Sequence, residues 1–489
     1  MRSFLQLSTA ISARQARYCA LNVRRWITIY EAVENQVLED INIDHIRNFS
    51  VIAHVDHGKS TLSDAILQLT GNISETDRKK GQVLDTLKVE RERGITVKAN
   101  TASMIYEDRR TNQRYLLNLI DTPGHIDFSY EVSRSLASCQ GALLLVDSTQ
   151  SIQAQTLSNH AKAKALGLGI IPVITKIDLP NAQPIDAALT MATTFHVDAE
   201  DVIMTSAKKS VGIHEVLQSI IDKLPSPKSL CQPADKPFYG RIVDSWFDEH
   251  RGVVCLLQVV SGSIQETDKI SMYASLQDIQ NNQNNDELGH KTEFSVQELG
   301  ILTPLPVRTK KLLPGQVGYI IAGLRSTRQA RIGDTIFLPT QWQHNPEDLK
   351  PLPGYEAAKP MLYASIYPVD TKEYDNLLSA VDKLLLNDSS VTVSKEQSLS
   401  LGSGLRCGFL GFLHMEVFNQ RLKDEFGIEV VMTTPSVPYK IQMMSTGPHG
   451  PQVEDDEEAA KLIHCVSQWP AFESRYHVFE PIAKVWHPL

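Results

Sequence analysis

Residues 53–60 read Ala-His-Val-Asp-His-Gly-Lys-Ser, a stretch whose residue types can surround a phosphate group. In such a loop the backbone N–H groups and the positive end of the following helix face a β-phosphate. Lys59 can reach the β- and γ-oxygens, and the Ser60 hydroxyl can ligate Mg²⁺. The first glycine of the usual pattern is replaced by Ala53. This phosphate loop predicts contacts to a nucleotide from Ala53, His54, Val55, Asp56, His57, Gly58, Lys59, Ser60 and Thr61.

A second block, residues 121–125, reads Asp-Thr-Pro-Gly-His. Asp121 can hold Mg²⁺ through water, and the N–H of Gly124 can sense a γ-phosphate. His125 comes next, where a side chain that orients or polarises the attacking water is required. A Pro-Gly turn is also common in plain hairpins, and a turn histidine can simply bond to backbone. We interpret the block as a switch, with nucleotide contacts from Asp121, Thr122, Pro123 and Gly124 and with His125 as the catalytic residue.

Between these blocks lies a charged stretch, residues 91–96, with the sequence Arg-Glu-Arg-Gly-Ile-Thr. Such a stretch can be a solvated surface. We interpret it instead as the other switch, in which Thr96 closes on Mg²⁺ when the γ-phosphate is present. The predicted Mg²⁺ ligands are therefore Ser60, Thr96 and, through water, Asp121.

Residues 175–178, Thr-Lys-Ile-Asp, predict the site that reads the base. A carboxylate accepts two hydrogen bonds, which matches the N1–H and N2–H₂ donors of guanine and mismatches adenine, so Asp178 specifies GTP. Lys176 belongs to the same block. The usual first residue is Asn, whereas Thr175 has no amide, which leaves open its contact to the base and its brace to the phosphate loop. The loop that covers the base is predicted at Ser206, Ala207 and Lys208.

Short apolar runs precede these blocks and predict the strands that position them. The helix expected over 58–69 has apolar residues at helical spacing, and strands alternate with helices throughout residues 46–225. This alternation is typical of a parallel sheet with crossover helices, an α/β P-loop domain. The order and spacing of the five blocks predict a GTP hydrolase that converts GTP to GDP and phosphate, with Mg²⁺ as cofactor.

The chain beyond this domain is expected to form two further domains of different class. Gly-punctuated β-rich runs over 237–340, interrupted by a Gln- and Asn-rich loop at 277–286, favour an antiparallel β-barrel. A Pro-rich linker at 351–360 follows. Residues 358–436 predict the order β-α-β-β-α-β of an α+β ferredoxin-like domain. Its elements are expected at 361–366, 372–386, 390–395, 398–401, 412–426 and 429–434. Residues 437–489 are expected to form a linker and the start of another domain.

One apolar stripe in this region has two interpretations. It consists of Phe409, Leu410, Phe412, Leu413 and Val417. The spacing favours the core of the domain over a surface that binds a partner. We therefore expect these side chains to be buried.

The 489-residue chain has a net charge of −9, yet residues 1–30 carry five Arg and no acidic residue. That composition is typical of a mitochondrial transit peptide, and a disordered basic tail is the alternative. The remaining residues carry −14, which argues against indiscriminate nucleic-acid binding, and no DNA partner is expected. The six cysteines include no Cys-x-x-Cys pair, which favours a reducing compartment and argues against zinc. The apolar runs are too short to span a bilayer.

Five longer strings carry a family resemblance. They are AHVDHGKSTLSDAIL, QVLDTLKVERERGITVKA, DTPGHIDFSYEVSRSLASCQGALLLVD, PGYEAAKPMLYASIYPVD and LRCGFLGFLHMEVFNQRLKDEFGIEVV. With them the chain resembles the LepA translational GTPases, also called elongation factor 4, in their mitochondrial branch. The similarity runs from about residue 47 to residue 483, and the last string separates this family from elongation factor G and BipA.

The resemblance implies ribosome-dependent GTP hydrolysis in mitochondrial protein synthesis. It implies as partners the mitochondrial ribosome with its RNA and, indirectly, tRNAs on improperly translocated ribosomes, which the family is proposed to move one codon backward. It also implies peripheral attachment to the matrix side of the inner membrane, and we expect a monomer. His125 would reach the water through an apolar gate formed by Val55 and Ile95.

Two features depart from the family pattern. Thr175 is one. The other is the strand expected from Phe479 to Ala483, which resembles the opening of the family's next domain, although the sequence ends at Leu489. An α/β domain and a basic C-terminal domain of the family would then be missing. Both features motivate an alternative function, a guanine-nucleotide-binding interaction protein that docks on the ribosome or membrane without turnover.

Overall fold

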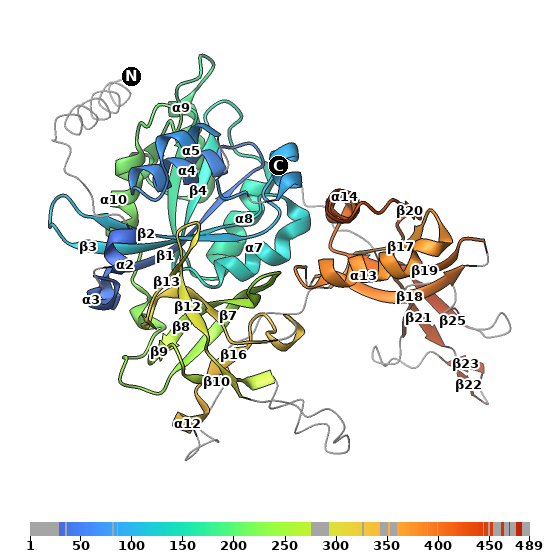
Figure 1. Cartoon of the computed structure of the whole chain (residues 1–489). Coiled ribbons are helices and arrows are strands. Elements are labelled where there is room, and N and C mark those ends of the chain that lie inside the picture. Colours follow the sequence, from blue (N-terminus) through green and yellow to red (C-terminus); the bar gives the residue numbers. More distant parts are fainter. Residues whose placement is uncertain are drawn as a thin grey trace. The chain divides into compact units, whose positions relative to one another are not determined.

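The computed structural model describes residues 29–34, 37–80, 83–85, 87–274, 293–324, 327–342, 351–352, 359–388, 390–398, 400–443, 445–447, 450–452, 461–463, 469 and 476–481. They fall into two units, Met1–Glu356 and Ala357–Leu489 (Figure 1). The expected transit peptide up to residue 28, the loop at 277–286 and most of the linker at 351–360 lie outside the described residues.

The first unit begins with a six-stranded sheet in the order β2-β3-β1-β4-β5-β6. All neighbours are parallel except β2 and β3, which pair antiparallel. The sheet is parallel as expected except at this edge, where the short connection 108–113 makes a hairpin and leaves no room for a crossover helix. The strands are β1 Ile46–Ala53, β2 Asn100–Glu107, β3 Arg114–Asp121, β4 Gly141–Asp147, β5 Gly169–Thr175 and β6 Ile203–Met204.

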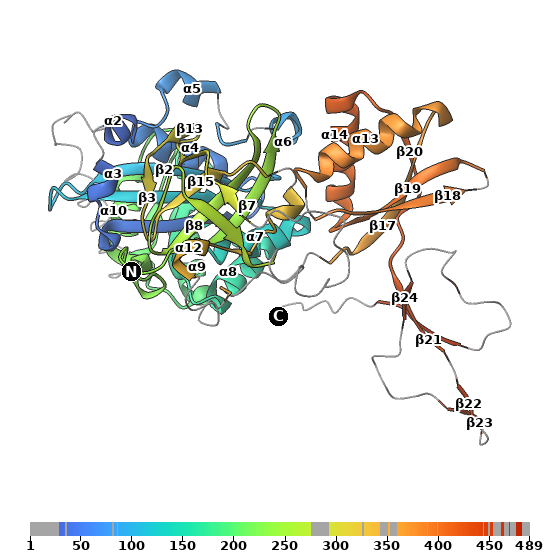
Figure 2. The same ribbon diagram turned by 60° about the horizontal axis from the view of Figure 1, so that its bottom comes forward.

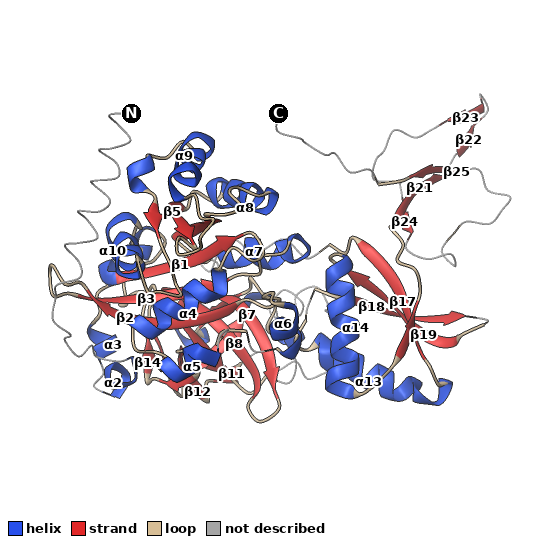
Figure 3. Cartoon of the chain, turned by 90° about the horizontal axis from the view of Figure 1, so that it is seen from above, coloured by secondary structure: helices blue, strands red, loops and turns tan. Residues whose placement is uncertain are grey.

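Helices cover both faces of this sheet (Figure 3). Alternate residues of β1 point to opposite faces, so that Phe49 and Val51 pack with α4 and α10 while Ile52 packs with α7, α8 and α9. The covering helices are α4 Lys59–Leu69, α7 Ser129–Leu136, α8 Ala154–Ala165, α9 Pro184–Phe195 and α10 Ile213–Lys223. Shorter helices are α2 Ile29–Glu34, α3 Val37–Asp40, α5 Glu75–Lys80 and α6 Lys88–Arg93.

The same unit continues into an antiparallel sheet in the order β11-β10-β16-β7-β8-β15-β12-β13, with a separate β14-β9 ribbon (Figure 2). Its inward residues share one apolar core with Ile46, Ile105 and Leu116 of the first sheet. The strands are β7 Tyr239–Asp248, β8 Gly252–Ser261, β9 Ile264–Gln265, β10 Lys269–Met272, β11 Phe294–Ser295, β12 Glu298–Leu302, β13 Pro306–Arg308, β14 Lys311–Leu312, β15 Val317–Ile321 and β16 Thr335–Phe337, followed by α12 Pro339–Trp342.

Polar contacts also fasten the antiparallel sheet to the six-stranded sheet. Arg134 of α7 forms an ion pair with Asp244 of β7 at 3.1 Å, and the side chains are only 4% and 8% exposed. Asn48 of β1 donates to the carbonyl of Gly315 at 3.1 Å. The two contacts link α7 and β1 to the antiparallel sheet. Removing one partner of the buried ion pair would leave an uncompensated charge, so this link is costly to break.

The second unit contains a four-stranded antiparallel sheet in the order β18-β19-β17-β20. Both of its helices pack against one face, in a single core with β17 and β19. This is the predicted ferredoxin-like arrangement, and the predicted order of domain classes is confirmed. The elements are β17 Leu362–Pro368, α13 Tyr374–Leu385, β18 Thr392–Ser398, β19 Gly402–Phe409, α14 Phe412–Phe426 and β20 Val430–Met432.

Two local expectations in this unit are wrong. The second strand of the hairpin was expected at 398–401, but the chain turns there, and the strand lies at Gly402–Phe409 because Gly402, at φ +79°, completes the turn. The apolar stripe is only partly core. Phe409 and Val417 are buried, whereas Phe412, the first residue of α14, is 53% exposed.

The remaining described strands pair after β20. β21 Tyr439–Met443 lies between β24 Lys461–Ile463 and β25 Tyr476–Phe479, and β22 Ser445–Gly447 pairs with β23 Gly450–Gln452. A strand was expected to begin at Phe479, but β25 ends at that residue. Pro481 lacks the N–H needed to extend the ladder. In the part of the chain that the structure describes, no helix is long and apolar enough to cross a membrane.

Candidate nucleotide site

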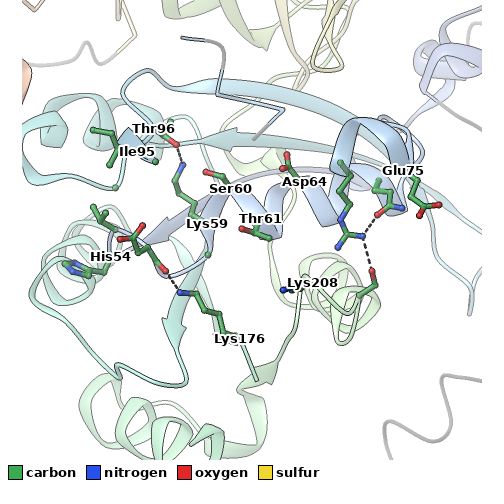
Figure 4. Close-up of a pocket in the computed structure, with 18 residues that line it drawn as sticks. His54, Lys59, Ser60, Thr61, Asp64, Glu75, Ile95, Thr96, Lys176 and Lys208 are labelled. Carbon is green, nitrogen blue, oxygen red and sulfur yellow. Dashed lines mark hydrogen bonds between the residues drawn. The ribbon is translucent and has the colours of Figure 1, made fainter. Parts of the chain in front are cut away.

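A cavity of about 800 Å³ opens at the carboxyl ends of the parallel strands (Figure 4). Ligands of open α/β sheets bind at this edge, because the loops that follow the strands converge there. The predicted site residues that line it are His54, Val55, Asp56, Gly58, Lys59, Ser60, Thr61, Thr96, Gly124, Lys176 and Lys208. The others, which do not line it, are Ala53, His57, Asp121, Thr122, Pro123, His125, Thr175, Asp178, Ser206 and Ala207.

The phosphate loop joins the buried end of β1 to the first turn of α4. Asp56 and Gly58 have positive φ angles of 64° and 87°, and the turn they make carries the chain into the helix. Gly58 caps α4 without a side chain, so the first N–H groups of the helix have no capping oxygen from this residue. Orphan N–H groups at a helix N-terminus attract an anion, and Lys59, Ser60 and Thr61 occupy those positions.

Lys59 is the centre of a buried polar network. Its Nζ lies 2.7 Å from both Thr96 Oγ1 and Asp121 Oδ2. The Thr96 hydroxyl in turn donates to Asp85 Oδ1 at 2.9 Å. Burial raises the pKa of the Asp121 carboxyl, the Lys59 ammonium opposes this shift, and the Asp85 carboxylate adds to it. Oxygen atoms from β3 and from the switch at 91–96 therefore converge on one cation.

The donor set suits Mg²⁺, a hard cation that prefers oxygen ligands. Asp121 Oδ1 is buried and has no hydrogen-bond partner among the described residues, and the same is true of Asp85 Oδ2. Ser60 lines the cavity beside Lys59 (Figure 4). The residues present thus fit the predicted ion, with Ser60, Thr96 and Asp121 as the side chains that would hold it.

Glu90 holds the ends of the segment that carries Thr96. Its Oε2 accepts from Leu87 N at 2.8 Å, and its Oε1 accepts from Val97 N at 2.9 Å and from Lys98 N at 3.0 Å. Burial nevertheless raises the pKa of this carboxyl. Three N–H donors on one buried carboxylate fix the loop around Thr96, a role that sequence analysis missed.

His125 lies at the entrance to a short 3₁₀ turn and does not line the cavity. Its Nδ1 accepts from Asp127 N at 3.2 Å. The ring is 29% exposed. Val55 and Ile95, the expected gate residues, both line the cavity together with Gly124. The structure therefore brings together the gate and Gly124 but does not bring His125 into the cavity.

Two of the residues predicted to read the base are joined by a hydrogen bond. Ser206 Oγ donates to Asp178 Oδ1 at 2.7 Å, and this bond lowers the pKa of the Asp178 carboxyl. An ionised carboxylate is acceptor-only, which is the form that guanine requires.

Thr175 braces the phosphate loop with its hydroxyl. Thr175 Oγ1 donates to the carbonyl of His57 at 2.7 Å. Lys176 adds a second link, since its Nζ lies 2.5 Å from the carbonyl of Asp56 and 2.9 Å from Asp147 Oδ2. The sequence left open whether Thr175, which has no amide, can brace the phosphate loop. In the structure it does so through its hydroxyl, which bonds to a backbone carbonyl of that loop.

His57 is buried beneath this brace. Its Nδ1 accepts from Asp147 N at 3.2 Å. Burial, followed by the nearby His54 ring, lowers the pKa of His57 to about 4. The imidazole is thus neutral near pH 7 and adds no positive charge to the phosphate loop, which leaves Lys59 as the buried cation of that loop.

Comparison with known proteins agrees with this geometry. Residues 44–226 match the family model described as the Elongation factor Tu GTP binding domain. The chain is 48% identical over 447 residues to a protein of Phytophthora infestans named Translation factor GUF1 homolog, mitochondrial, covering 91% of this chain and 63% of that protein. It is 48% identical over 462 residues to human Translation factor GUF1, mitochondrial, covering 94% and 64%.

A solved structure shows the fold at lower identity. A crystal structure of a Thermus thermophilus protein matches with a TM-score of 0.60 and 17% identity, and the match covers 84% of this chain and 72% of that one. The chain thus spans less than two thirds of the length of the two mitochondrial relatives above.

The fold and the site define a GTP-binding domain of the elongation-factor type, followed by antiparallel-sheet domains. Over 91% and 94% of its length the chain is similar to the two relatives named Translation factor GUF1.

The Thr175 brace yields a first prediction. Thr175→Val removes the hydroxyl at nearly constant volume and leaves the His57 carbonyl without its donor, a loss of about 1–3 kcal/mol. We expect the affinity for a fluorescent GDP analogue to fall about tenfold, as measured by titration. Thr175→Ser keeps the hydroxyl and is the matched control. Equal affinities of the valine variant and the unchanged chain would show that the brace is dispensable.

Proposed function

We propose that residues 46–225 bind GTP with Mg²⁺ and hydrolyse it to GDP and phosphate, and that the chain acts in this way as a translation factor of mitochondrial protein synthesis. The observation that carries this proposal is the convergence of Lys59, Thr96 and Asp121 at a single buried point. A γ-phosphate is the ligand whose presence or absence such a switch distinguishes.

The residues have distinct parts in the proposed reaction. Lys59 and the first N–H groups of α4 bind the phosphates, and Asp178 with Ser206 selects guanine. His125 orients the attacking water after moving between Val55 and Ile95. Mg²⁺, when bound, supplies positive charge that offsets the charge developing on the phosphate oxygens.

Hydrolysis requires a change of conformation at His125. The ring is held by the N–H of Asp127 and lies outside the cavity lining. A single hydrogen bond of this kind contributes about 1 kcal/mol, which contact with a large partner can readily replace. We propose that the mitochondrial ribosome is this partner.

The finer features of the proposal derive from the family resemblance. They are action on improperly translocated ribosomes, one-codon backward movement of tRNAs, contact with ribosomal RNA, and peripheral association of a monomer with the matrix side of the inner membrane. The relatives' names, which call them mitochondrial translation factors, support the compartment and the process. Residues 1–30 would direct import.

A second candidate function is favoured by the position of His125. If the ring stays bonded to Asp127, the chain is a guanine-nucleotide-binding interaction protein without turnover. Single-turnover GTP hydrolysis, measured with and without mitochondrial ribosomes, separates the two functions. Stimulation by ribosomes supports the enzyme, and its absence supports the interaction protein.

The catalytic role of His125 yields a second prediction. His125→Ala should leave GTP affinity nearly unchanged and slow ribosome-stimulated hydrolysis about 10²-fold or more, because the group acts on water and not on the nucleotide. The measurement is single-turnover hydrolysis beside a GTP titration. His250→Ala, in the exposed turn between β7 and β8, is the matched control. A comparable loss of nucleotide affinity would instead make His125 a structural residue.

Base selection by Asp178 yields a third prediction. Asp178→Asn replaces an acceptor with a donor, so the preference should shift from GTP toward xanthosine triphosphate, whose C2 oxygen accepts. Competition binding with both triphosphates measures this shift. Asp186→Asn, an exposed residue in the first turn of α9, controls for the loss of one charge. If Asp178→Asn binds GTP as the unchanged chain does, the base is read elsewhere.

A further inference from the structure

An arginine that sequence analysis did not single out lies across the base side of the cavity. Arg78 belongs to α5, the short helix that lies between α4 and the switch at 91–96. Its Nη1 donates to Gln68 Oε1 and, at 3.0 Å, to Ser210 Oγ. Its Nη2 donates to the carbonyl of Ala207. One guanidinium thus joins three segments of the chain.

These contacts bridge two walls of the cavity. Glu75 and Arg78 line it from α5, whereas Lys208 and Ser210 line it from the base loop, residues 206–210. Figure 4 shows Glu75 and Lys208 on separate segments that border the same space. The arginine therefore closes the span between them.

The base loop is a tight unit, so a bond to one residue constrains the others. Ser206 forms backbone bonds with Val211 in both directions at 3.0 Å, and Lys209 N donates to Ser206 Oγ at 3.2 Å. Ser206 Oγ also donates to Asp178. Holding the carbonyl of Ala207 thus fixes the residue beside the one that orients the base-reading carboxylate.

The other end of the bridge depends on tertiary contacts. α5 has six residues, and a helix of that length is marginal without packing. Ser74 accepts from Asp77 N at 3.1 Å at its start. The planar fork of Arg78 then ties the helix to α4 and to the base loop at once, a geometry that an ammonium group cannot reproduce.

We propose that Arg78 is a positioning residue that sets the rate at which bound guanine nucleotide leaves the site. Its contacts with Gln68, Ala207 and Ser210 form a latch between the base loop and the segment that leads into the switch at 91–96. With the latch closed, the loop keeps Asp178 oriented and the base cannot leave. Opening the latch frees the loop, and movement of α5 opens it.

This inference rests on the proposed function, because it requires guanine-nucleotide binding. The experiment uses the full 489-residue chain loaded with a fluorescent GDP analogue and chased with excess GDP in a stopped-flow instrument. Arg78→Ala should speed dissociation about tenfold or more, since charge-assisted hydrogen bonds are lost. Arg78→Lys, which keeps the charge without the fork, should lie between the alanine variant and the unchanged chain.

Two further variants separate a latch from general support of the fold. Ser210→Ala removes one acceptor and should speed dissociation by a smaller factor, with no added effect in the Arg78→Ala background. Lys223→Ala removes an exposed cation of α10 that does not line the cavity and should have no effect.

The outcomes are distinct. If the unchanged chain binds no guanine nucleotide, the proposed function fails together with the latch. If it binds GDP and Arg78→Ala releases GDP at the unchanged rate, the latch alone is overturned. Equally fast GDP release from Lys223→Ala and Arg78→Ala would also overturn it, since that pattern describes a general loosening of the fold.

Discussion

A single buried ammonium group, Lys59 Nζ, holds together the parts of the nucleotide site. It contacts Thr96 and Asp121 at 2.7 Å each, and Asp85 lies behind Thr96. Without Lys59, the buried Asp121 carboxylate would lose its counter-charge in a medium of low polarity, where an unpaired charge costs several kcal/mol. The lysine thus keeps the phosphate loop, β3 and the switch at 91–96 in register before a nucleotide arrives.

The rest of the first unit keeps this point in place. Glu90 holds both ends of the loop that carries Thr96, and Thr175 holds the loop that carries Lys59. The ion pair between Arg134 and Asp244 carries the constraint into the antiparallel sheet. A ligand that draws Lys59 away from Asp121 therefore loosens contacts on several elements, which is the physical basis for the proposed switch.

Sequence reasoning succeeded where the signal is local. The helix expected over 412–426 has those bounds in the structure. It ends before Gly427, whose positive φ of 67° suits the end of a helix. The order of domain classes followed from patterning in the same way. The phosphate loop and the block at 121–125 could be placed for a related reason, because their residue types are dictated by the ligand.

It failed where the outcome depends on distant contacts. β2 was missed because its pairing with β3 overrode the parallel pattern of its neighbours. Thr175 braces the phosphate loop through a carbonyl that lies 118 residues away in the sequence. Arg78 likewise contacts a loop that lies 129 residues away. No local pattern encodes such distances. The position of His125 outside the cavity is likewise set by a turn and not by its motif.

The most direct test of the central claim is the thermal unfolding of the nucleotide-free chain and of Lys59→Met, each with and without excess GDP and Mg²⁺. If Lys59 neutralises Asp121 before a nucleotide binds, Lys59→Met should lose about 3 kcal/mol without ligand and gain no stability from GDP. Adding Asp121→Asn should recover the stability but not the response to GDP. A Lys59→Met chain that is as stable as the unchanged one without nucleotide would contradict the account.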